Sequence, residues 1–339
     1  MLDEIRTLCT LNGISGNEDR VREYIKSRLE GKCEYHSDAL GNIIAFCKGR
    51  KNGGKKLMVA AHMDEVGLLV TYINDDGTLA FDAVGGINTD VIAGRQVYIY
   101  ERNVTGVVGA KPVHHLSDAE RKAPLDISSL YIDIGAKSRD EAEKLVSVGD
   151  CIAFESSFEN LGGDRICSKA LDDRAGCAVM LSLIDEGVEY DTYFVFSVEE
   201  EIGLRGAQTA AYAVEPEFAV VIETTTAADI SGATGAKRVC ELGKGAVISY
   251  RDRRTVYDKE LYDLAFSLGK LNGIPCQTKT LIAGGNDAGA IHISKSGVRT
   301  IAVSAPCRYL HSPSCTAQYS DIEMCKALVR LLITGINEL

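Results

Sequence analysis

The second half of the chain alternates between short apolar runs and longer amphipathic segments. Apolar residues recur at helical spacing in four segments: 172–183, 204–213, 259–271 and 320–336. Compact apolar runs predict four buried strands: 192–197, 217–222, 275–281 and 298–304. Strands that alternate with helices of this length are typical of an α/β fold with a mostly parallel sheet and helices on both faces.

The first 66 residues continue this pattern. Ser15-Gly-Asn-Glu18 resembles a capping box, residues 21–29 then repeat apolar positions at helical spacing, and residues 55–61 read as a short buried strand. We therefore expect the α/β domain to begin in this part of the chain.

Residues 67–164 have a different pattern. Short β-like runs are separated by turn sequences such as Asn74-Asp-Asp-Gly77, and the one predicted helix covers 138–146. We expect a catalytic α/β domain formed by residues 1–66 and 165–339, interrupted by a β-rich domain at 67–164.

Composition narrows the class of protein. The 339 residues are 45% hydrophobic and 25% charged, as in a soluble globular protein. A formal net charge of -11 argues against nucleic acid or an anionic membrane as a partner. The acidic first residues do not resemble a signal peptide, and no apolar run approaches the roughly 20 residues of a membrane span. We expect a cytoplasmic protein.

The 11 cysteines form no Cys-x-x-Cys pair and no regular spacing. That pattern favours reduced cysteines that act as small core residues. Cys315 lies near a candidate metal ligand, but a packing role is the simpler interpretation.

Polar residues follow several of the predicted strands and begin one predicted helix. His62 and Asp64 lie on one side of an extended segment, since strand side chains alternate. The other positions are Asp172, Asp173, Glu199, Glu200, Glu201, Glu223 and His311. In open α/β sheets, ligands bind beyond the carboxyl ends of the strands. Each feature alone has a structural explanation, such as a helix cap or a solvated turn, but together they favour a site.

Carboxylates with two histidines and no thiolate suit Zn²⁺, Co²⁺ or Mn²⁺, and a shared carboxylate would hold two ions roughly 3.5–4 Å apart. A dinuclear hydrolase also needs a carboxylate that takes a proton from the attacking water. The consecutive glutamates after residue 198 offer both a ligand and such a base.

Four segments resemble, in order, the motifs of a known family. They are His62-Met-Asp-Glu-Val-Gly67, Ser168-Lys-Ala-Leu-Asp-Asp-Arg174, Val198-Glu-Glu-Glu-Ile-Gly-Leu-Arg-Gly206 and Arg308-Tyr-Leu-His-Ser312. The chain resembles the dinuclear metallo-aminopeptidases of peptidase family M42, which include glutamyl aminopeptidases, tetrahedral (TET) aminopeptidases and cellulase-M-like and FrvX-like proteins.

The resemblance implies a role for each matching residue. His62 and Glu223 would bind one ion, Glu200 and His311 the other, and Asp172 both. Glu199 would be the general base, and Asp64 would orient His62. Glu223 stands where the family usually has aspartate. The segment Ala283-Gly-Gly-Asn-Asp-Ala-Gly289 resembles a substrate loop, which makes Gly284, Gly285, Asn286 and Asp287 candidate substrate-binding residues.

The resemblance also implies peptide substrates, a PDZ-like dimerisation role for the β-rich insert, and dimers that assemble into a tetrahedral dodecamer. Two divalent ions, Zn or Co with Mn as an alternative, would be the cofactors. The expected activity is a metal-dependent aminopeptidase that attacks peptides with a metal-bridging water and a glutamate base.

Three alternatives stay open at this point. A carboxypeptidase, dipeptidase or deacylase could use the same pair of ions. A glycosidase also needs paired carboxylates, although a chain without Trp has few platforms for sugar rings. The third is an assembly protein without activity, against which the spare acid argues. The first-residue preference is open too: Arg308 and Lys237 could favour acidic side chains, but each is more simply a structural or surface cation.

Overall fold

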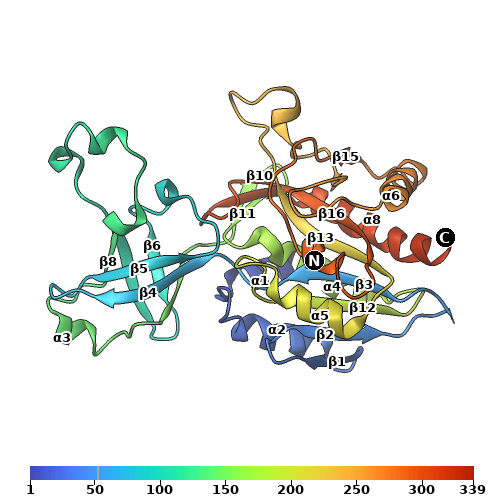
Figure 1. The fold of residues 1–339 in the computed structure, drawn as a ribbon, viewed down its shortest axis with the longest axis horizontal. Helices are drawn as coiled ribbons and strands as arrows, with labels where there is room; N and C mark the ends of the chain where they lie inside the picture. The colour runs from blue at the N-terminus through green and yellow to red at the C-terminus, as the bar shows by residue number, and fades with distance from the viewer. Residues whose placement is uncertain (52) are drawn as a thin grey trace.

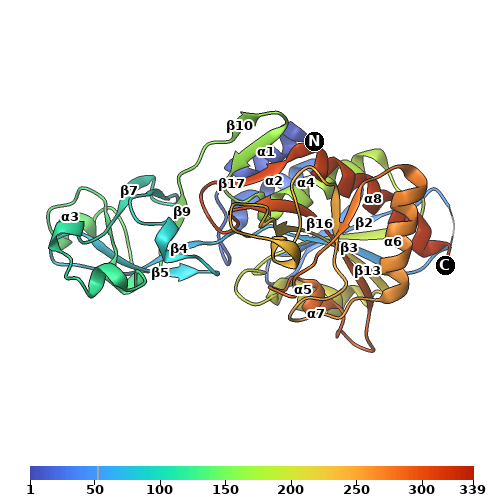
Figure 2. The same ribbon diagram turned by 90° about the horizontal axis from the view of Figure 1, so that it is seen from above.

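The computed structural model describes residues 1–51 and 53–339. Figures 1 and 2 both show a larger α/β domain beside a smaller β barrel along the long axis of the molecule. Within the described ranges, no helix has the length and apolar character needed to cross a membrane. All 11 cysteines are free thiols.

The α/β domain is built on an 11-stranded sheet. Its main path runs β1-β2-β12-β3-β13-β16-β17-β11-β10, with β14 and β15 attached beside β16. The bounds are β1 Glu34–Ser37, β2 Ile43–Cys47, β3 Leu57–His62, β10 Glu159–Gly162, β11 Arg165–Ser168, β12 Thr192–Ser197, β13 Phe218–Thr226, β14 Ala246–Ile248, β15 Cys276–Thr278, β16 Arg299–Arg308 and β17 Cys315–Gln318.

The sheet is parallel at its centre, and β14 and β15 form a further parallel pair beside β16. Strands β12, β3, β13 and β16 are mutually parallel, whereas β1, β2, β17, β11 and β10 add to the two edges in antiparallel pairs. The expected mostly parallel sheet is therefore a mixed one. Short connections such as the turn between β1 and β2 can only reverse the chain, and a parallel neighbour needs a long crossover.

Helices cover both faces of this sheet, as expected. They are α1 Leu2–Thr10, α2 Asp19–Leu29, α4 Leu171–Glu186, α5 Arg205–Val214, α6 Lys259–Asn272, α7 Ala288–Ile291 and α8 Tyr319–Asn337. Along β3, Val59 and Ala61 pack with α1, α2, α4 and α8, whereas Met58 and Ala60 pack with α5 and α7. Because side chains alternate along the strand, β3 contributes residues to the apolar cores on both faces of the sheet.

The insert is a closed six-stranded antiparallel barrel in the order β4-β5-β8-β7-β6-β9. Its strands are β4 Gly67–Ile73, β5 Leu79–Val84, β6 Gln96–Ile99, β7 Val104–Gly109, β8 Tyr131–Asp133 and β9 Cys151–Phe154. A separate apolar core fills it. By strand pairing the barrel ends near residue 154, because β10 already belongs to the large sheet.

Short helices complete the chain. They are the α-helix α3 Arg139–Ala142 and the 3₁₀ turns η1 Thr89–Val91, η2 Val113–His115, η3 Glu120–Lys122, η4 Ile127–Ser129 and η5 Gly235–Arg238. Ser138 caps α3 as predicted, with its side chain accepting from the Glu141 amide. The helix is shorter than the predicted 138–146, since Gly149 donates to the Val70 carbonyl and the chain must turn back to reach β4.

Candidate metal centre and active site

The sheet brings the candidate residues together at one edge. His62 ends β3, and its backbone is in register with Ser197 at the end of β12. On the other side of β3, Glu223 of β13 is in register with Ser304 of β16. Because these four strands are parallel, their carboxyl ends and the loops that follow them meet at the same place.

His62 is held by the backbone two residues further on. Its Nδ1 donates to the Asp64 carbonyl oxygen at 3.1 Å, and its Nε2 lies 3.5 Å from both Asp172 Oδ1 and Glu223 Oε1. The side chain is only 2% exposed. With Nδ1 protonated, Nε2 presents a lone pair to the two carboxylates.

His311 repeats this arrangement on the other side of Asp172. Its Nδ1 donates to the Gly86 carbonyl oxygen at 2.6 Å, while Nε2 lies 3.4 Å from Asp172 Oδ2 and 3.3 Å from Glu201 Oε1. Asp172 therefore lies between the two histidines, with one carboxylate oxygen toward each.

The donor set fits a pair of metal ions. Bonds of about 2.0–2.1 Å in a tetrahedral site place ligand atoms roughly 3.3–3.4 Å apart, and the separations here are 3.3–3.5 Å. Asp172 Oδ1 and Asp173 Oδ2 are buried without a hydrogen-bond partner among the described residues. Two groups of ligand atoms lie within 4.8 Å: His62, Asp172 and Glu201, and Asp172, Asp173 and Glu223.

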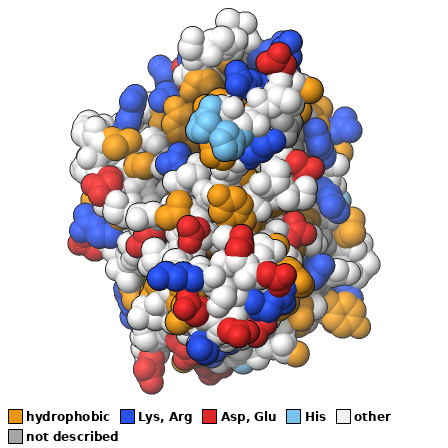
Figure 3. Space-filling view, turned by 90° about the vertical axis from the view of Figure 1, so that its left-hand side faces the viewer, with side chains coloured by type: hydrophobic (Ala, Val, Ile, Leu, Met, Phe, Trp, Pro, Cys, Tyr) orange, Lys and Arg blue, Asp and Glu red, His pale blue; other side chains and the backbone are white. Residues whose placement is uncertain are grey.

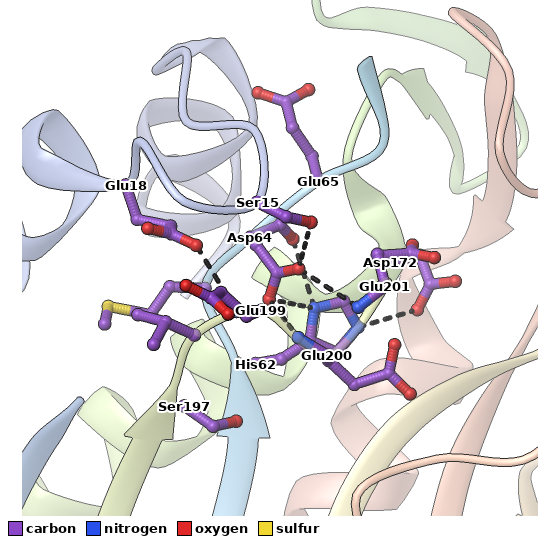
Figure 4. A network of polar contacts seen from close by, with 12 residues as sticks. Ser15, Glu18, His62, Asp64, Glu65, Asp172, Ser197, Glu199, Glu200 and Glu201 are labelled. Atoms are coloured by element: carbon purple, nitrogen blue, oxygen red, sulfur yellow. Dashed lines mark hydrogen bonds and ion pairs between the residues drawn. The ribbon is translucent and has the colours of Figure 1, made fainter. Parts of the chain in front are cut away.

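Of the three consecutive glutamates, Glu200 and Glu201 line one cavity and Glu199 does not. Glu201 contacts His311, and Glu200 lines the same cavity as the metal-ligand candidates. Glu199 does not line that cavity, and its carboxylate lies 3.5 Å from Arg205. In Figure 4 the Glu199 side chain lies on the Glu18 side of His62, while those of Glu200 and Glu201 lie on the Asp172 side.

The positions of Glu199 and Glu200 differ from what their expected roles require. Glu199, expected as the general base, lies outside the cluster, and Glu200, expected as a ligand, has no histidine nitrogen within ion-pair distance among the described residues. The backbone explains the difference. Glu199 adopts a left-handed conformation with φ of +55°, which turns its side chain away from the two that follow.

Asp64 holds this turn together. Its carboxylate accepts from Ser15 Oγ at 2.6 Å and from the backbone amides of Glu200 and Glu201 at 3.0 and 3.1 Å. The sequence had suggested that Ser15 caps α2. It does not, because its hydroxyl donates to Asp64 instead. Asp64 both orients His62 through its carbonyl and fixes the backbone of the glutamates, as the dashed contacts in Figure 4 show.

The charges in the cluster shift the pKa values of its histidines upward. Burial would lower the pKa of His62, but the charge of Glu223 and bonds to Asp172 and Asp64 raise it well above its ordinary value. Burial also opposes the shift of His311, whose pKa the bond to Asp172 nevertheless raises to about 10. Burial would raise the pKa of Asp172, yet its polar contacts with His311 and His62 hold that pKa well below its usual range.

The pKa values of the glutamates are raised, whereas that of Asp172 is lowered. Burial is the main cause that raises the pKa of Glu201 to about 7. Burial also raises the pKa of Glu200 and of Glu223 well above the usual range, the latter with help from the charge of Asp172. A raised pKa makes the Glu200 carboxylate a stronger proton acceptor than an exposed glutamate.

A cavity of about 470 Å³ opens over this cluster. Gly284, Gly285 and Asn286 of the predicted substrate loop line it, together with Arg254 and Lys279. Asp287 does not, since it accepts a hydrogen bond from Ser197 beneath the loop. Sequence reasoning noted Glu201 among three consecutive acids but assigned it no role, and it missed Arg254 and Lys279. No local pattern distinguishes one of three adjacent glutamates, and the two cations lie in loops without regular periodicity.

Comparisons with known proteins agree with this architecture. The profile of the family described as M42 glutamyl aminopeptidase matches residues 41–328. A protein of Acetivibrio thermocellus is 42% identical over 340 residues, covering 99% of this chain and 98% of that protein. The lysyl aminopeptidase of Pyrococcus furiosus is 34% identical over 334 residues, covering 96% and 94%.

A solved structure extends the similarity to the whole fold. The TET1 peptidase of Pyrococcus horikoshii, which can assemble into a tetrahedron or a large octahedral shell, is 36% identical with a TM-score of 0.86, covering 98% of each chain. The family resemblance drawn from the four motifs is therefore confirmed: the chain belongs to the M42 glutamyl aminopeptidase family.

Proposed function

We propose that the protein is a metal-dependent aminopeptidase with two divalent ions per chain. The observation that carries the proposal is Asp172, whose two carboxylate oxygens each face the Nε2 of a histidine at 3.4–3.5 Å. His62 and Glu223 would complete one ion site, and His311 and Glu201 the other. Nitrogen and oxygen ligands without thiolate suit Zn²⁺ or Co²⁺, with Mn²⁺ as an alternative.

Bound divalent ions would polarise a peptide carbonyl and acidify a water molecule at this site. Glu200 lines the cavity beside the ligands without a histidine partner, so we assign it as the general base in place of Glu199. Its carboxylate would take the proton from the attacking water and pass it to the leaving nitrogen. Asp64 would position Glu200 and Glu201 through their amides. The acids of the cluster favour a substrate with a free amine.

We also propose that the first residue of the substrate is acidic. Two cationic side chains, Arg254 and Lys279, line the cavity together with the acidic cluster. Among the described residues neither side chain has a hydrogen-bond or ion-pair partner, so both charges are available to a ligand. A lysyl substrate, as named for the Pyrococcus furiosus relative, would meet like charge here. Arg308, considered from the sequence, is instead paired with Asp229 at 2.7 Å.

Hydrolysis of aminoacyl-p-nitroanilides, each with its N-acetylated twin, tests both proposals. Chelator-stripped enzyme and enzyme reloaded with Zn²⁺, Co²⁺ or Mn²⁺ are compared on Glu, Asp, Gln, Leu and Lys substrates. We expect metal-dependent cleavage of free-amine Glu and Asp substrates at least tenfold faster than Gln. Cleavage of the acetylated twins, or of none, would contradict the aminopeptidase and favour a deacylase or carboxypeptidase.

Substitutions of Arg254 and Lys279 test whether these two cations bind an acidic first residue of the substrate. Arg254→Gln and Lys279→Gln should each raise KM for the Glu substrate about tenfold and leave the Leu substrate unchanged. The matched controls are Arg253→Gln, an exposed neighbour outside the cavity, and Lys244→Gln, an exposed lysine elsewhere. An unchanged Glu/Leu ratio in both cavity variants would contradict the acidic preference.

We further propose that the barrel, which makes up most of the predicted 67–164 insert, acts as a PDZ-like unit and mediates self-association into dimers and a tetrahedral dodecamer. Figure 3 views the molecule from the barrel end, where histidines lie beside apolar side chains. Val113, 67% exposed, belongs to the turn η2 with His114 and His115. Assembly of the Pyrococcus horikoshii relative supports the proposal. A cytoplasmic location stays a prediction.

A further inference from the structure

The segment that carries His311 is held from the barrel side in two places. Gly86, two residues after β5 of the barrel, accepts the hydrogen bond from His311 Nδ1 at 2.6 Å. Ser156, two residues after β9, donates from Oγ to the Pro313 carbonyl oxygen at 2.8 Å. Gly86 lies in the loop between the barrel strands β5 and β6, whereas Ser156 lies in the segment that leads from β9 of the barrel to β10 of the large sheet.

Ser156 also contacts a second ligand-bearing segment. Its Oγ accepts from the backbone amide of Lys169 at 3.2 Å, three residues before Asp172. One hydroxyl thus joins the loop of His311 to the turn that leads into Asp172. Since a hydroxyl can donate once and accept twice, it can make both hydrogen bonds at the same time.

The two histidines therefore depend on different parts of the molecule. His62 is 2% exposed and is held by Asp64, two residues away on its own segment. His311 is 34% exposed, and the partner that fixes its tautomer is the Gly86 carbonyl, in the loop between the barrel strands β5 and β6. Only the Nδ1-protonated tautomer leaves Nε2 free to bind an ion.

We propose that Ser156 and Gly86 are positioning residues through which the barrel sets the affinity of the outer ion, the one bound by His311 and Glu201. A displacement of the barrel against the α/β domain would turn His311 and weaken this site, while the ion at His62 and Glu223 stays bound. The inference rests on the proposed dinuclear centre.

Ser156→Ala tests the hydroxyl, with Ser157→Ala as the matched control on the adjacent, exposed serine. Bound zinc per chain is measured by mass spectrometry after dialysis, and affinity by competition with a chromophoric chelator. We expect two ions in wild type, and a loss of roughly 10–100-fold in affinity for one of them in Ser156→Ala. Ser157→Ala should match wild type, and Ser156→Thr, which keeps a hydroxyl, should recover most of the affinity.

Gly85→Ala tests the carbonyl contact independently. Gly85 has φ of +87°, and a Cβ there would lie 2.7 Å from Val66 Cγ1 and 3.3 Å from Glu201 Cβ, so the turn that carries Gly86 must shift. Gly135→Ala is the control, because Gly135 lies in the barrel with φ of +80° and open space around it. Imidazole ¹⁵N shifts should report a loss of the Nδ1-protonated His311 tautomer in Gly85→Ala and none in Gly135→Ala.

The outcomes separate the inference from the proposed function. If wild type binds two ions and both Ser156→Ala and Gly85→Ala bind the second with wild-type affinity, the positioning role is wrong and the dinuclear centre stands. If wild type binds fewer than two ions, both proposals are overturned. Thermal unfolding of each variant checks that a loss of metal does not reflect a loss of fold.

Discussion

At the scale of single residues, the backbone decides which of several identical side chains reaches the site. Glu199, Glu200 and Glu201 are chemically the same, yet Asp64 accepts only the amides of the last two. The left-handed Glu199 takes its carboxylate toward Arg205. Asp64 thus fixes the backbone from which the side chains of Glu200 and Glu201 extend.

Glu200→Gln should abolish turnover while metal binding is retained. An amide cannot accept the proton from water, and loss of a general base costs about 10²–10⁴-fold in kcat. Steady-state kinetics and metal content are measured together, with Glu199→Gln as the matched control, which should stay within about twofold of wild type. An inactive Glu199→Gln beside an active Glu200→Gln would restore the assignment expected from the sequence.

At the scale of elements, a helix cap predicted from local sequence forms when no distant residue competes for the capping side chain. Helix α6 begins after Asp258, whose Oδ1 accepts from the Leu261 amide at 3.0 Å. The same carboxylate accepts from Arg299 at the start of β16 at 2.7 Å, so the cap also fixes the helix on the sheet.

Asp258→Ala should destabilise the protein by about 1–2 kcal/mol at pH 7, the usual cost of a lost cap. The hydrogen bond from Arg299 is the main cause that lowers the pKa of Asp258. A lowered folded pKa stabilises the protein above the unfolded value near 3.9 and loses that effect as pH falls through the folded value. The difference in urea midpoints between wild type and variant should therefore narrow below about pH 4.

Asp263→Ala provides the comparison on the same helix. Asp263 is 57% exposed and pairs only with the exposed Lys259, and such surface pairs contribute about 0–1 kcal/mol. A cost for Asp263→Ala as large as that for Asp258→Ala would contradict the capping argument.

At the scale of the whole molecule, the fold concentrates acids that repel one another in one buried place. Without metal, His62 and His311 have raised pKa values, and so do Glu200, Glu201 and Glu223. The cluster therefore retains protons near neutral pH. Binding of ions must displace these protons, since histidine and carboxylate bind metal in their deprotonated forms.

We expect zinc binding to release protons at pH 7 and to strengthen as pH rises from 6 to 8. Calorimetry in two buffers with different ionisation enthalpies measures the released protons directly. The increase in unfolding temperature on adding zinc should also grow as pH rises from 6 to 8. A ligand at 100 times its Kd stabilises the folded state by about 2.7 kcal/mol. His114→Ala, an exposed histidine of the barrel, should leave both quantities unchanged. Binding without proton release would contradict the assigned ligands.

The sequence by itself determined several elements and the family. Apolar periodicity placed α5, α6, α8 and β12 to within about two residues, and four motifs identified the family. Periodicity suffices for these elements because burial of one face decides both where a helix forms and where it ends.

Only the tertiary structure decided how those residues are used. Ser15 donates its hydroxyl to Asp64 and does not cap a helix. Glu201, and not Glu200, contacts His311. Arg254 and Lys279, from loops distant in the sequence, line the same cavity as the acids. The physical reason is that a hydrogen bond or ion pair depends on distances of a few ångströms between residues far apart in the chain. Local propensity carries no information about such distances; the packing of the strands and loops around the site fixes them.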